Sequence, residues 1–248
     1  MALKNNKSLG QHWLKNRIIL DDIADMAKGP GGLCLEIGPG LGTLTSSLLR
    51  RFDKVIAVEF DENLARNLPK SFPGKNLEVI NADFLKFDLN QVPSPYVVAG
   101  NIPYYITSPI IEKLLKAENK PERIVLLIQK EVAERIADEK ETVLSLFVKN
   151  YADVTLGPIV KKDEFTPPPK VDSEIIILDV KKSPEIPEEV FTLIKKGFVS
   201  PRKKLIQNLT TYKSKEDLKN ILISLGISEN ARPADLHLKD WQNLFNVL

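Results

Sequence analysis

The chain has 248 residues, of which 43% are hydrophobic and 27% are charged, and its formal net charge is only +2. This length allows one full domain core and a small second domain. No run approaches the roughly 18 uninterrupted apolar residues of a transmembrane helix, and residues 1–15 lack the apolar stretch of a signal peptide, so we expect no membrane association. The single cysteine, Cys34, lies in an apolar run and the two histidines are far apart, which favours a reducing, cytoplasmic location and argues against a metal site.

The first segment that suggests a ligand follows a short apolar run. Residues 33–37 predict a buried strand, and Gly-Pro-Gly-Leu-Gly at residues 38–42 predicts a tight turn before a helix that begins near Thr43. Gly38 and Gly40 would let the backbone approach a ligand closely. An ordinary strand-to-helix turn has the same pattern, and the G-x-G-x-G spacing differs from the G-x-G-x-x-G of pyrophosphate-binding proteins. The glycine turn alone therefore does not identify a ligand site, and the segments that follow it in the sequence must be considered with it.

Acidic residues follow the next two predicted strands. Residues 54–58 form an apolar run closed by Glu59, and residues 77–80 form another that is followed by Asp83. Ligands of open α/β sheets bind outside the carboxyl ends of the strands, so Glu59 is placed to accept both ribose hydroxyls and Asp83 to accept from the amino group of adenine. Either acid alone would be read as a helix cap. Beside the glycine turn, they predict a nucleoside ligand without a pyrophosphate.

The fourth apolar run, residues 96–100, is followed by Asn-Ile-Pro-Tyr at residues 101–104. The side-chain oxygen of Asn101 and the carbonyl of Ile102 can both accept hydrogen bonds from a planar amino group. Pro103 restricts the backbone and removes a competing donor, and Tyr104 offers a face on which a nucleobase can stack. We therefore expect this segment to hold the amino group of an adenine.

The remaining elements predict a doubly wound α/β domain followed by a helical one. After the fourth strand we expect a helix at 108–115, a strand at 123–128, a helix at 142–151, and two antiparallel strands at 154–160 and 174–180. From about residue 184 only helical spacing remains, at 187–199, 202–212, 215–225 and 236–247. The predicted domains are residues 1–182 and 183–248.

These motifs together resemble the rRNA adenine N6,N6-dimethyltransferase family, whose members are S-adenosylmethionine (SAM)-dependent class I methyltransferases acting on 16S rRNA of the small subunit. Five further segments match its pattern: 8–14, 129–135, 165–173, 198–209 and 232–236 with Trp241. In the first of them His12 and Trp13 replace the usual Asn and Phe. The resemblance implies a Rossmann-like seven-stranded sheet with an antiparallel last strand, and a small all-helical C-terminal domain for RNA recognition.

The resemblance also implies the site residues. The target adenine would be held by Asn101, Ile102 and Pro103 and flanked by Tyr104 on one face and Phe165 on the other. The cofactor, SAM, would be held by Gln11, His12, Leu14, Gly38, Gly40, Glu59, Asp83, Phe84 and Asn101. Catalysis would then come mainly from orientation of the amino group, since no strong general base lies in the motif.

Two basic segments without acidic residues, 1–20 and 195–204, are expected to contact phosphates. Besides Lys195 and Lys196, their cations are the expected RNA contacts Lys4, Lys7, Lys15, Arg17, Arg202, Lys203 and Lys204. The expected partner is 16S rRNA within a small ribosomal subunit or its precursor, with the target adenines in a hairpin loop near the 3′ end. Nothing in the sequence demands a dimer, so we expect a monomer that also takes part in subunit biogenesis.

Other functions fit part of the pattern. A large-subunit rRNA adenine methylase of the macrolide-resistance type shares the catalytic motifs, and a ribosome assembly factor without catalytic activity could share the fold. A nucleotide-dependent oxidoreductase is disfavoured by the glycine spacing. DNA adenine methylation is compatible with the Asn-Ile-Pro-Tyr motif, but the full-length resemblance points to RNA.

Overall fold

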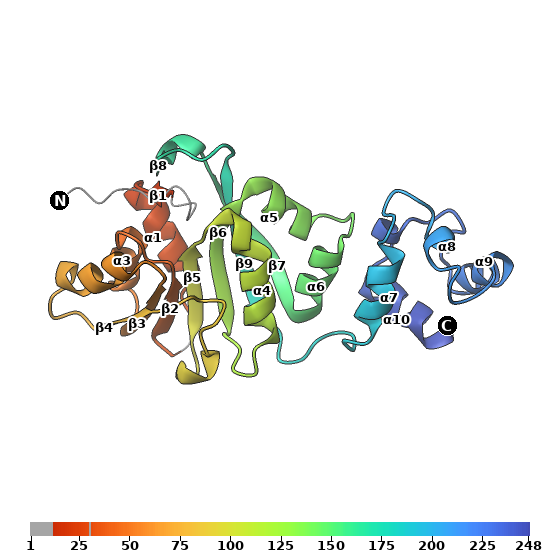
Figure 1. Ribbon diagram of the computed structural model, residues 1–248, viewed down its shortest axis with the longest axis horizontal. Helices are drawn as coiled ribbons and strands as arrows, with labels where there is room; N and C mark the ends of the chain where they lie inside the picture. Colours follow the sequence, from red (N-terminus) through yellow and green to blue (C-terminus); the bar gives the residue numbers. More distant parts are fainter. Residues whose placement is uncertain (1–11, 30) are drawn as a thin grey trace. The chain divides into compact units, whose positions relative to one another are not determined.

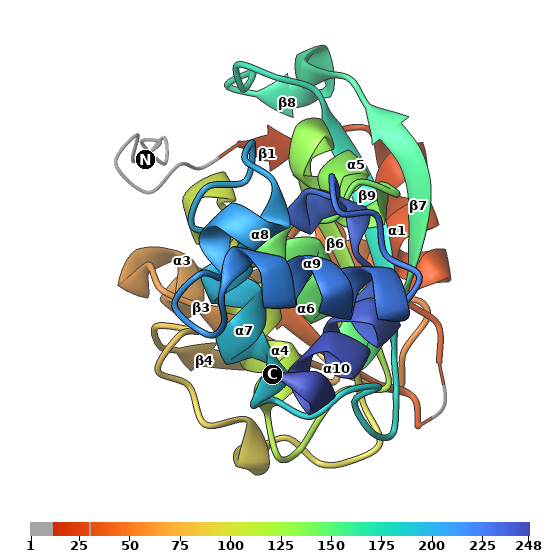
Figure 2. The ribbon, with the colours of Figure 1, turned by 90° about the vertical axis from the view of Figure 1, so that its right-hand side faces the viewer.

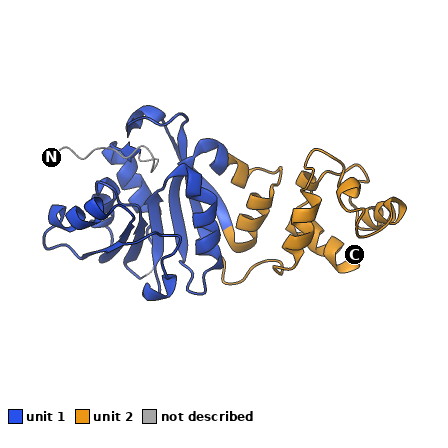
Figure 3. Cartoon of the chain, viewed as in Figure 1, with its two compact units in different colours: residues 1–133, 153–180 blue, residues 134–152, 181–248 orange. Residues whose placement is uncertain are grey.

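The computed structural model describes residues 12–29 and 31–248 (Figure 1). Its contacts divide the chain into two compact units (Figure 3). Unit 1 comprises Met1–Ala133 and Asp153–Val180, and unit 2 comprises Glu134–Ala152 and Lys181–Leu248. The predicted boundary at 182/183 would leave residues 134–152 with the first domain, whereas their contacts group them with the C-terminal residues. The second unit is therefore larger than the sequence suggested.

Unit 1 is built on a seven-stranded sheet with the order β4-β3-β2-β5-β6-β9-β7 (Figure 1). The strands are β2 (Leu33–Ile37), β3 (Lys54–Glu59), β4 (Leu77–Asn81), β5 (Val97–Asn101), β6 (Arg123–Gln129), β7 (Ala152–Val160) and β9 (Ser173–Val180). The ladder from β4 to β6 is parallel, and β9 runs antiparallel to β6. The predicted fold class, with its reversed last strand, is confirmed.

The register of the parallel strands places their carboxyl ends at one edge of the sheet. Ile37 of β2 lies beside Val58 of β3 and Gly100 of β5, and Glu59 at the end of β3 lies beside Asn81 at the end of β4. The glycine turn, the two acidic segments and the Asn-Ile-Pro-Tyr segment all leave the sheet at this edge. The topology thereby brings together four segments that the sequence separates by tens of residues.

Helices α1 (Arg17–Met26) and α2 (Thr43–Leu48) cover one face of the sheet. The Asn16 side chain caps α1 by accepting a hydrogen bond from the Ile18 amide at 3.0 Å. The shared core includes Leu20, Ile23, Leu44, Leu48, Cys34, Val55, Val97, Ala99, Val125 and Leu127. The sequence analysis did not identify α1, whose first four residues, 17–20, belong to the segment assigned to phosphate contacts.

The other helical elements of unit 1 connect the strands. They are α3 (Glu62–Asn67), η2 (Leu68–Ser71), η3 (Leu89–Gln91), η4 (Tyr104–Ile106), α4 (Thr107–Lys116), α5 (Lys130–Ala137, whose last residues belong to unit 2) and η5 (Lys162–Glu164). The buried stripe of α4 consists of Ile110, Ile111, Leu114 and Leu115. Its spacing is the helical period that the sequence displays.

A second, two-stranded sheet was not predicted. Strand β1 (Trp13–Leu14) pairs antiparallel with β8 (Phe165–Thr166), joining the N-terminal segment to the loop between β7 and β9 (Figure 2). Both Leu14 and Phe165 are buried in the core of unit 1. Strands of two residues carry no periodic signal, so pairing across about 150 positions could not be read from sequence.

Unit 2 is helical, as predicted. It contains α6 (Val143–Tyr151), α7 (Val190–Gly197), α8 (Leu205–Asn208), α9 (Lys215–Ser224), η6 (Pro233–Asp235) and α10 (Leu238–Val247). Trp241 of α10 is fully buried, and its ring lies 6.0 Å from that of Phe198. Helix α8 is much shorter than the predicted 202–212. The side chain of its last residue, Asn208, donates hydrogen bonds to the carbonyls of Gly197 and Ser200. Across the described ranges, no helix is long and apolar enough to cross a membrane.

Candidate active site

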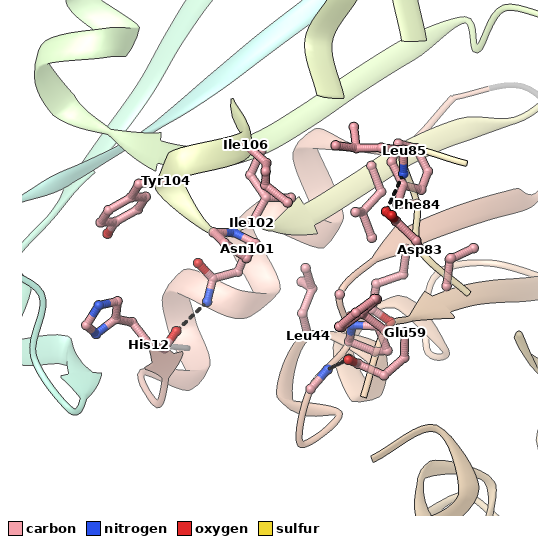
Figure 4. A pocket seen from close by; sticks show the side chains of 18 of the residues that line it. His12, Leu44, Glu59, Asp83, Phe84, Leu85, Asn101, Ile102, Tyr104 and Ile106 are labelled. Atoms are coloured by element: carbon pink, nitrogen blue, oxygen red, sulfur yellow. Dashed lines mark hydrogen bonds between the residues drawn. The ribbon is translucent and has the colours of Figure 1, made fainter. Parts of the chain in front are cut away.

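A cavity of about 360 Å³ opens at the carboxyl ends of β2, β3, β4 and β5 (Figure 4). This volume is within the range of small-molecule sites. Its lining includes the predicted residues His12, Gly38, Gly40, Glu59, Asp83, Phe84, Asn101, Ile102, Pro103 and Tyr104. The structure thus brings most of the predicted site together within unit 1.

The glycine turn has the conformation that its composition suggested. Gly38 and Gly40 have φ values of 65° and 56°, a left-handed region that side chains rarely adopt. A Cβ added at Gly38 would meet no atom within 4 Å, so the backbone there faces open space. The amide of Gly40 donates a 2.9 Å hydrogen bond to Glu59 Oε2. The turn and the end of β3 therefore position each other.

Glu59 is held by two backbone donors. Its Oε2 accepts from Gly40 and its Oε1 accepts from the Asp61 amide at 2.8 Å. The residue is only 5% exposed, and burial raises the pKa of its carboxyl while the backbone donors partly oppose that rise. Each carboxylate oxygen can accept a second hydrogen bond. The orientation of Glu59 suits a ligand with two adjacent hydroxyls.

Glu36 also lines the cavity, and sequence reasoning missed it. It is 1% exposed, and neither carboxylate oxygen has a hydrogen bond of good geometry within the described part of the chain. Its register partners on both sides are alanines, Ala57 and Ala99, whose small side chains leave room for the carboxyl. Burial raises the pKa of Glu36 to about 8; the neighbouring Thr45 opposes that rise, and the charge of Glu59 adds to it by a lesser amount.

The signal for Glu36 was present in the sequence as a charged residue inside an otherwise apolar strand. Burying a carboxylate without a partner lowers the stability of the fold, so a carboxyl in this position indicates a site where a bound ligand supplies the partner. Asp83 and Phe84 also line the cavity. Asp83 Oδ1 accepts from the Leu85 amide at 3.0 Å, and Phe84 is buried with its ring 6.5 Å from that of Phe87.

Asn101 is oriented by a long-range hydrogen bond. Its Nδ2 donates to the backbone carbonyl of His12 at 2.9 Å. Because a carbonyl only accepts, this bond determines which end of the amide is the nitrogen. Figure 4 shows the side-chain oxygen of Asn101 on the side that faces Tyr104. The acceptor oxygen of Asn101 is therefore directed toward the Tyr104 side of the cavity.

Tyr104 is anchored at its hydroxyl. The Tyr104 Oη and Ser173 Oγ lie 2.6 Å apart, and burial raises the pKa of the phenol against the opposing effect of this bond. The imidazole of His12 lies 6.1 Å from the Tyr104 ring, centroid to centroid, with 21° between the planes. The His12 Nδ1 is 2.7 Å from the carbonyl oxygen of Pro167. Segments around residues 12, 104 and 165–173 thus converge at one end of the cavity.

Two predicted contacts are not brought to the cavity. Phe165 is 3% exposed in the hydrophobic core, and Leu14 is fully buried beside it, because β1 and β8 direct both side chains inward. Neither residue lines this cavity, and the assignments of Phe165 to the face of the base and of Leu14 to the cofactor stay predictions. Trp13, by contrast, lines the cavity, and its Nε1 would lie 3.2 Å from a Cβ at Gly40.

The predicted RNA contacts are distributed over both units. Lys15 and Arg17 are exposed in unit 1, where Arg17 donates to Ser46 Oγ at 3.2 Å. The exposed cations before α8 belong to unit 2 and are Arg202, Lys203 and Lys204. Lys4, Lys7 and Gln11 lie outside the described residues. No group of three His, Cys, Asp or Glu side chains that could hold a metal occurs among the residues that the structure describes.

Comparison with known proteins agrees with this geometry. The family model for "Ribosomal RNA adenine dimethylase" matches residues 2–248. The chain is 38% identical over 260 residues to a "Ribosomal RNA small subunit methyltransferase A" from Picosynechococcus sp., with 96% of this chain and 95% of the relative covered. A protein of the same name from Thermosynechococcus vestitus is 37% identical over 259 residues, with 99% and 97% covered.

Two solved structures are similar over nearly the whole chain. A dimethyladenosine transferase from Plasmodium falciparum has a TM-score of 0.80 at 31% identity, covering 95% of this chain and 97% of the other. The 23S rRNA methyltransferase ErmE has a TM-score of 0.78 at 28% identity, covering 94% and 98%. Both the sheet and the helical C-terminal region therefore have counterparts.

Proposed function

Because this chain belongs to the ribosomal RNA adenine dimethylase family, we propose that it transfers methyl groups from SAM to N6 of adenines in small-subunit rRNA. Relatives that are 37–38% identical carry the small-subunit name, whereas the 23S enzyme is only 28% identical, which favours the small subunit over the large one. The observation that carries the chemistry is Asn101, whose amide is fixed with its nitrogen on His12 and its oxygen toward Tyr104.

The cavity fits SAM. Glu36 presents a buried carboxyl that has no hydrogen bond of good geometry from the described residues, which suits the ammonium group of the amino-acid end. The open backbone at Gly38 allows close approach, and Glu59 can accept from the ribose hydroxyls. Asp83 and Phe84 are placed for the amino group and the face of the adenine ring. When bound, SAM supplies an electrophilic methyl group on a sulfonium.

The residues of the chain then make the target amine reactive by orientation. The N6 lone pair of adenine is delocalised into the ring, so the nitrogen must be held pyramidal with that lone pair free. The Asn101 oxygen and the Ile102 carbonyl accept the two N6 hydrogens, and Pro103 keeps the segment extended with φ of −60°. Orientation of this kind can lower the activation free energy by about 7–11 kcal/mol, so no strong general base is needed.

The target adenine must be unpaired or flipped out, because N6 is engaged inside a duplex. A second methylation requires the monomethylated amine to rotate and bind again. A neutral amide at position 101 permits this, since it does not clamp the amine with a charge. The site is therefore suited to transfer two methyl groups to one nitrogen.

Binding of rRNA is assigned to the exposed cations of both units, with unit 2 as the RNA-recognition domain. Phosphate contacts make affinity depend on salt, and each neutralised phosphate contributes about −0.9 to the slope of log affinity against log salt on a duplex. Replacing Arg202, Lys203 and Lys204 by Ala should reduce that slope by two to three. An unchanged slope would remove these residues from the interface. We further expect a monomeric, cytoplasmic enzyme that uses no metal.

The direct test is mass spectrometry of rRNA after incubation of the protein and SAM with purified, unmethylated small and large ribosomal subunits in separate reactions. We expect dimethyladenosine in 16S rRNA alone. Modification of 23S rRNA instead would establish the macrolide-resistance type of activity. Absence of transfer to either subunit would leave a role in assembly without catalysis.

A further inference from the structure

Unit 1 has two exposed aromatic side chains among its described residues, and both line the cavity. Phe60 is 61% exposed and Tyr105 is 64% exposed, whereas the other aromatic rings of unit 1 in the described ranges are buried or half-buried. A single exposed apolar side chain is ordinary on a protein surface. Two exposed rings at the opening of one cavity instead indicate surfaces on which flat ligands can stack.

The two rings adjoin residues with different assignments. Phe60 follows Glu59 at the end of β3, the carboxylate assigned to the ribose of the cofactor. Tyr105 follows Tyr104 beyond the end of β5, and Tyr104 is assigned to the target base. The proposed function gives Tyr105 no role. Its place in the chain puts it on the side of the cavity where the RNA enters.

The turn η4 directs the rings of Tyr104 and Tyr105 to different sides. A 3₁₀ turn has about three residues per turn, so neighbouring side chains point about 120° apart. The Tyr104 ring is half-buried, and its Oη lies 2.6 Å from Ser173 Oγ. The Tyr105 ring is exposed. One tyrosine therefore faces into the protein while its neighbour faces the solvent at the cavity opening.

The backbone that carries Tyr105 is fixed on both sides. The amide of Ile106 donates to the Pro103 carbonyl at 3.2 Å, and the amide of Thr107 donates to the Tyr104 carbonyl. Thr107 is only 3% exposed, and helix α4 begins there. A ligand that stacks on Tyr105 would thus order only the torsions of one side chain, which keeps the entropic cost of binding small.

We infer that Tyr105 is a stacking platform for the nucleotide next to the target adenine, so that two consecutive tyrosines hold two consecutive bases. This inference rests on the proposed function. The target adenine enters the cavity unpaired, and the strand that carries it must pass the opening where the Tyr105 ring is exposed. Stacking on an aromatic ring tolerates any base, so the ligand is a nucleobase of single-stranded RNA without a required sequence.

Three substitutions separate stacking from other roles of the ring. Tyr105→Ala removes it, Tyr105→Leu keeps apolar volume without a flat face, and Tyr105→Phe keeps the flat face without the hydroxyl. Leu156→Ala is the control, because Leu156 is an exposed apolar side chain of β7 that does not line the cavity. Thermal denaturation checks that each variant is folded.

The measurements are the KM and kcat for methylation of unmethylated small subunits, the Kd for these subunits, and the Kd of SAM by calorimetry. Loss of one stacking contact lowers affinity about 5- to 150-fold, so Tyr105→Ala and Tyr105→Leu should raise the KM and Kd for the subunit by such a factor. Tyr105→Phe and Leu156→Ala should stay within about twofold of the wild type. The Kd of SAM should change by less than about twofold in all four variants.

A change in the RNA tests whether Tyr105 contacts the neighbouring nucleotide. Mass spectrometry locates the methylated adenine, and small subunits are then reconstituted with 16S rRNA that lacks the base on its 5′ or its 3′ side. Loss of the stacked base should lower kcat/KM of the wild type by the same factor as Tyr105→Ala, and should not lower that of Tyr105→Ala further. If the two losses multiply on both sides, the ring and the neighbouring base do not interact, and the inference is wrong.

Other outcomes would also overturn the inference. A Tyr105→Leu variant as active as Tyr105→Phe would show that the side chain acts by apolar cover alone. A raised Kd of SAM with an unchanged KM for the subunit would assign Tyr105 to the cofactor. If the wild type binds subunits but transfers no methyl group, the proposed function fails, whereas a raised Kd of Tyr105→Ala for the subunit would still support the stacking contact.

Discussion

The two halves of the cavity are assembled in different ways. The half assigned to the cofactor is built from residues at the ends of consecutive strands, β2, β3 and β4, and its main contact, Gly40 to Glu59, spans 19 positions. The half assigned to the target base depends on contacts between residues 89, 69 and 155 positions apart, namely Asn101 with His12, Tyr104 with Ser173, and His12 with Pro167. The first half follows from sheet topology, whereas the second requires segments that only tertiary packing brings together.

The largest expected effect is in the base half. Asn101→Ala removes the oriented acceptor, and loss of one preorganised hydrogen-bonding group lowers rates by about 100- to 1,000-fold. We expect methylation of small subunits to fall by that factor while the Kd of SAM is nearly unchanged. Asn63→Ala, on the exposed side of α3, is the control. Activity near that of the wild type would refute the role of Asn101.

The corresponding change in the cofactor half is Glu59→Ala. Hydrogen bonds to a charged group contribute about 1.5–3 kcal/mol, so we expect the Kd of SAM to rise about 10- to 100-fold. At saturating SAM the kcat should recover, since Asn101 and Tyr104 are intact. Glu62→Ala is the control, because its exposed carboxylate pairs with Arg66 away from the cavity. Titration calorimetry decides; a Kd equal to that of the wild type would exclude Glu59 from the cofactor site.

Glu36 predicts a pH dependence in the cofactor half. Its pKa in the folded protein is raised to about 8 from 4.5, so the folded state retains a proton that the unfolded state has lost between these values. Stability without cofactor should therefore decrease as the pH rises from about 5 to 8, and Glu36→Gln should be more stable than the wild type at pH 8. Melting temperatures of both proteins at pH 6 and 8 test this.

The same residue should make SAM binding depend on pH. An ammonium group beside Glu36 favours its ionised form, so binding should release a proton and tighten as the pH rises toward 8. Glu36→Gln should reduce that dependence. Calorimetry in buffers of different ionisation enthalpy measures the proton released, and an equal release in wild type and variant would contradict the assignment.

The smallest effect concerns the anchor of the base half. Tyr104→Phe keeps the ring and removes the hydrogen bond to Ser173, whose net contribution is about 0.5–1.5 kcal/mol. Methylation should fall about two- to tenfold, mainly through the position of the ring. Ser173→Ala should give a similar loss, and the double variant should be no worse than either single one. Additive losses would show that the two residues act separately.

The sequence by itself determined the sheet, the helical C-terminal region and most of the cavity. Alternating and continuous apolar runs identify the seven strands, and the topology of an α/β sheet then brings the residues at their carboxyl ends together. Gly38, Glu59, Asp83 and Asn101 could be found in this way because each lies at the carboxyl end of a strand or within two residues of it. The family match confirms the resemblance that these motifs suggested.

Only the tertiary structure decided which side chains are buried. The pairing of β1 with β8 turns Phe165 and Leu14 into the core. The room for the buried Glu36 carboxyl beside Ala57 and Ala99 likewise depends on the register of β3 and β5 against β2. These outcomes rest on contacts between segments distant in the chain. Neither periodicity nor motif spacing shows which side chains such contacts will bury.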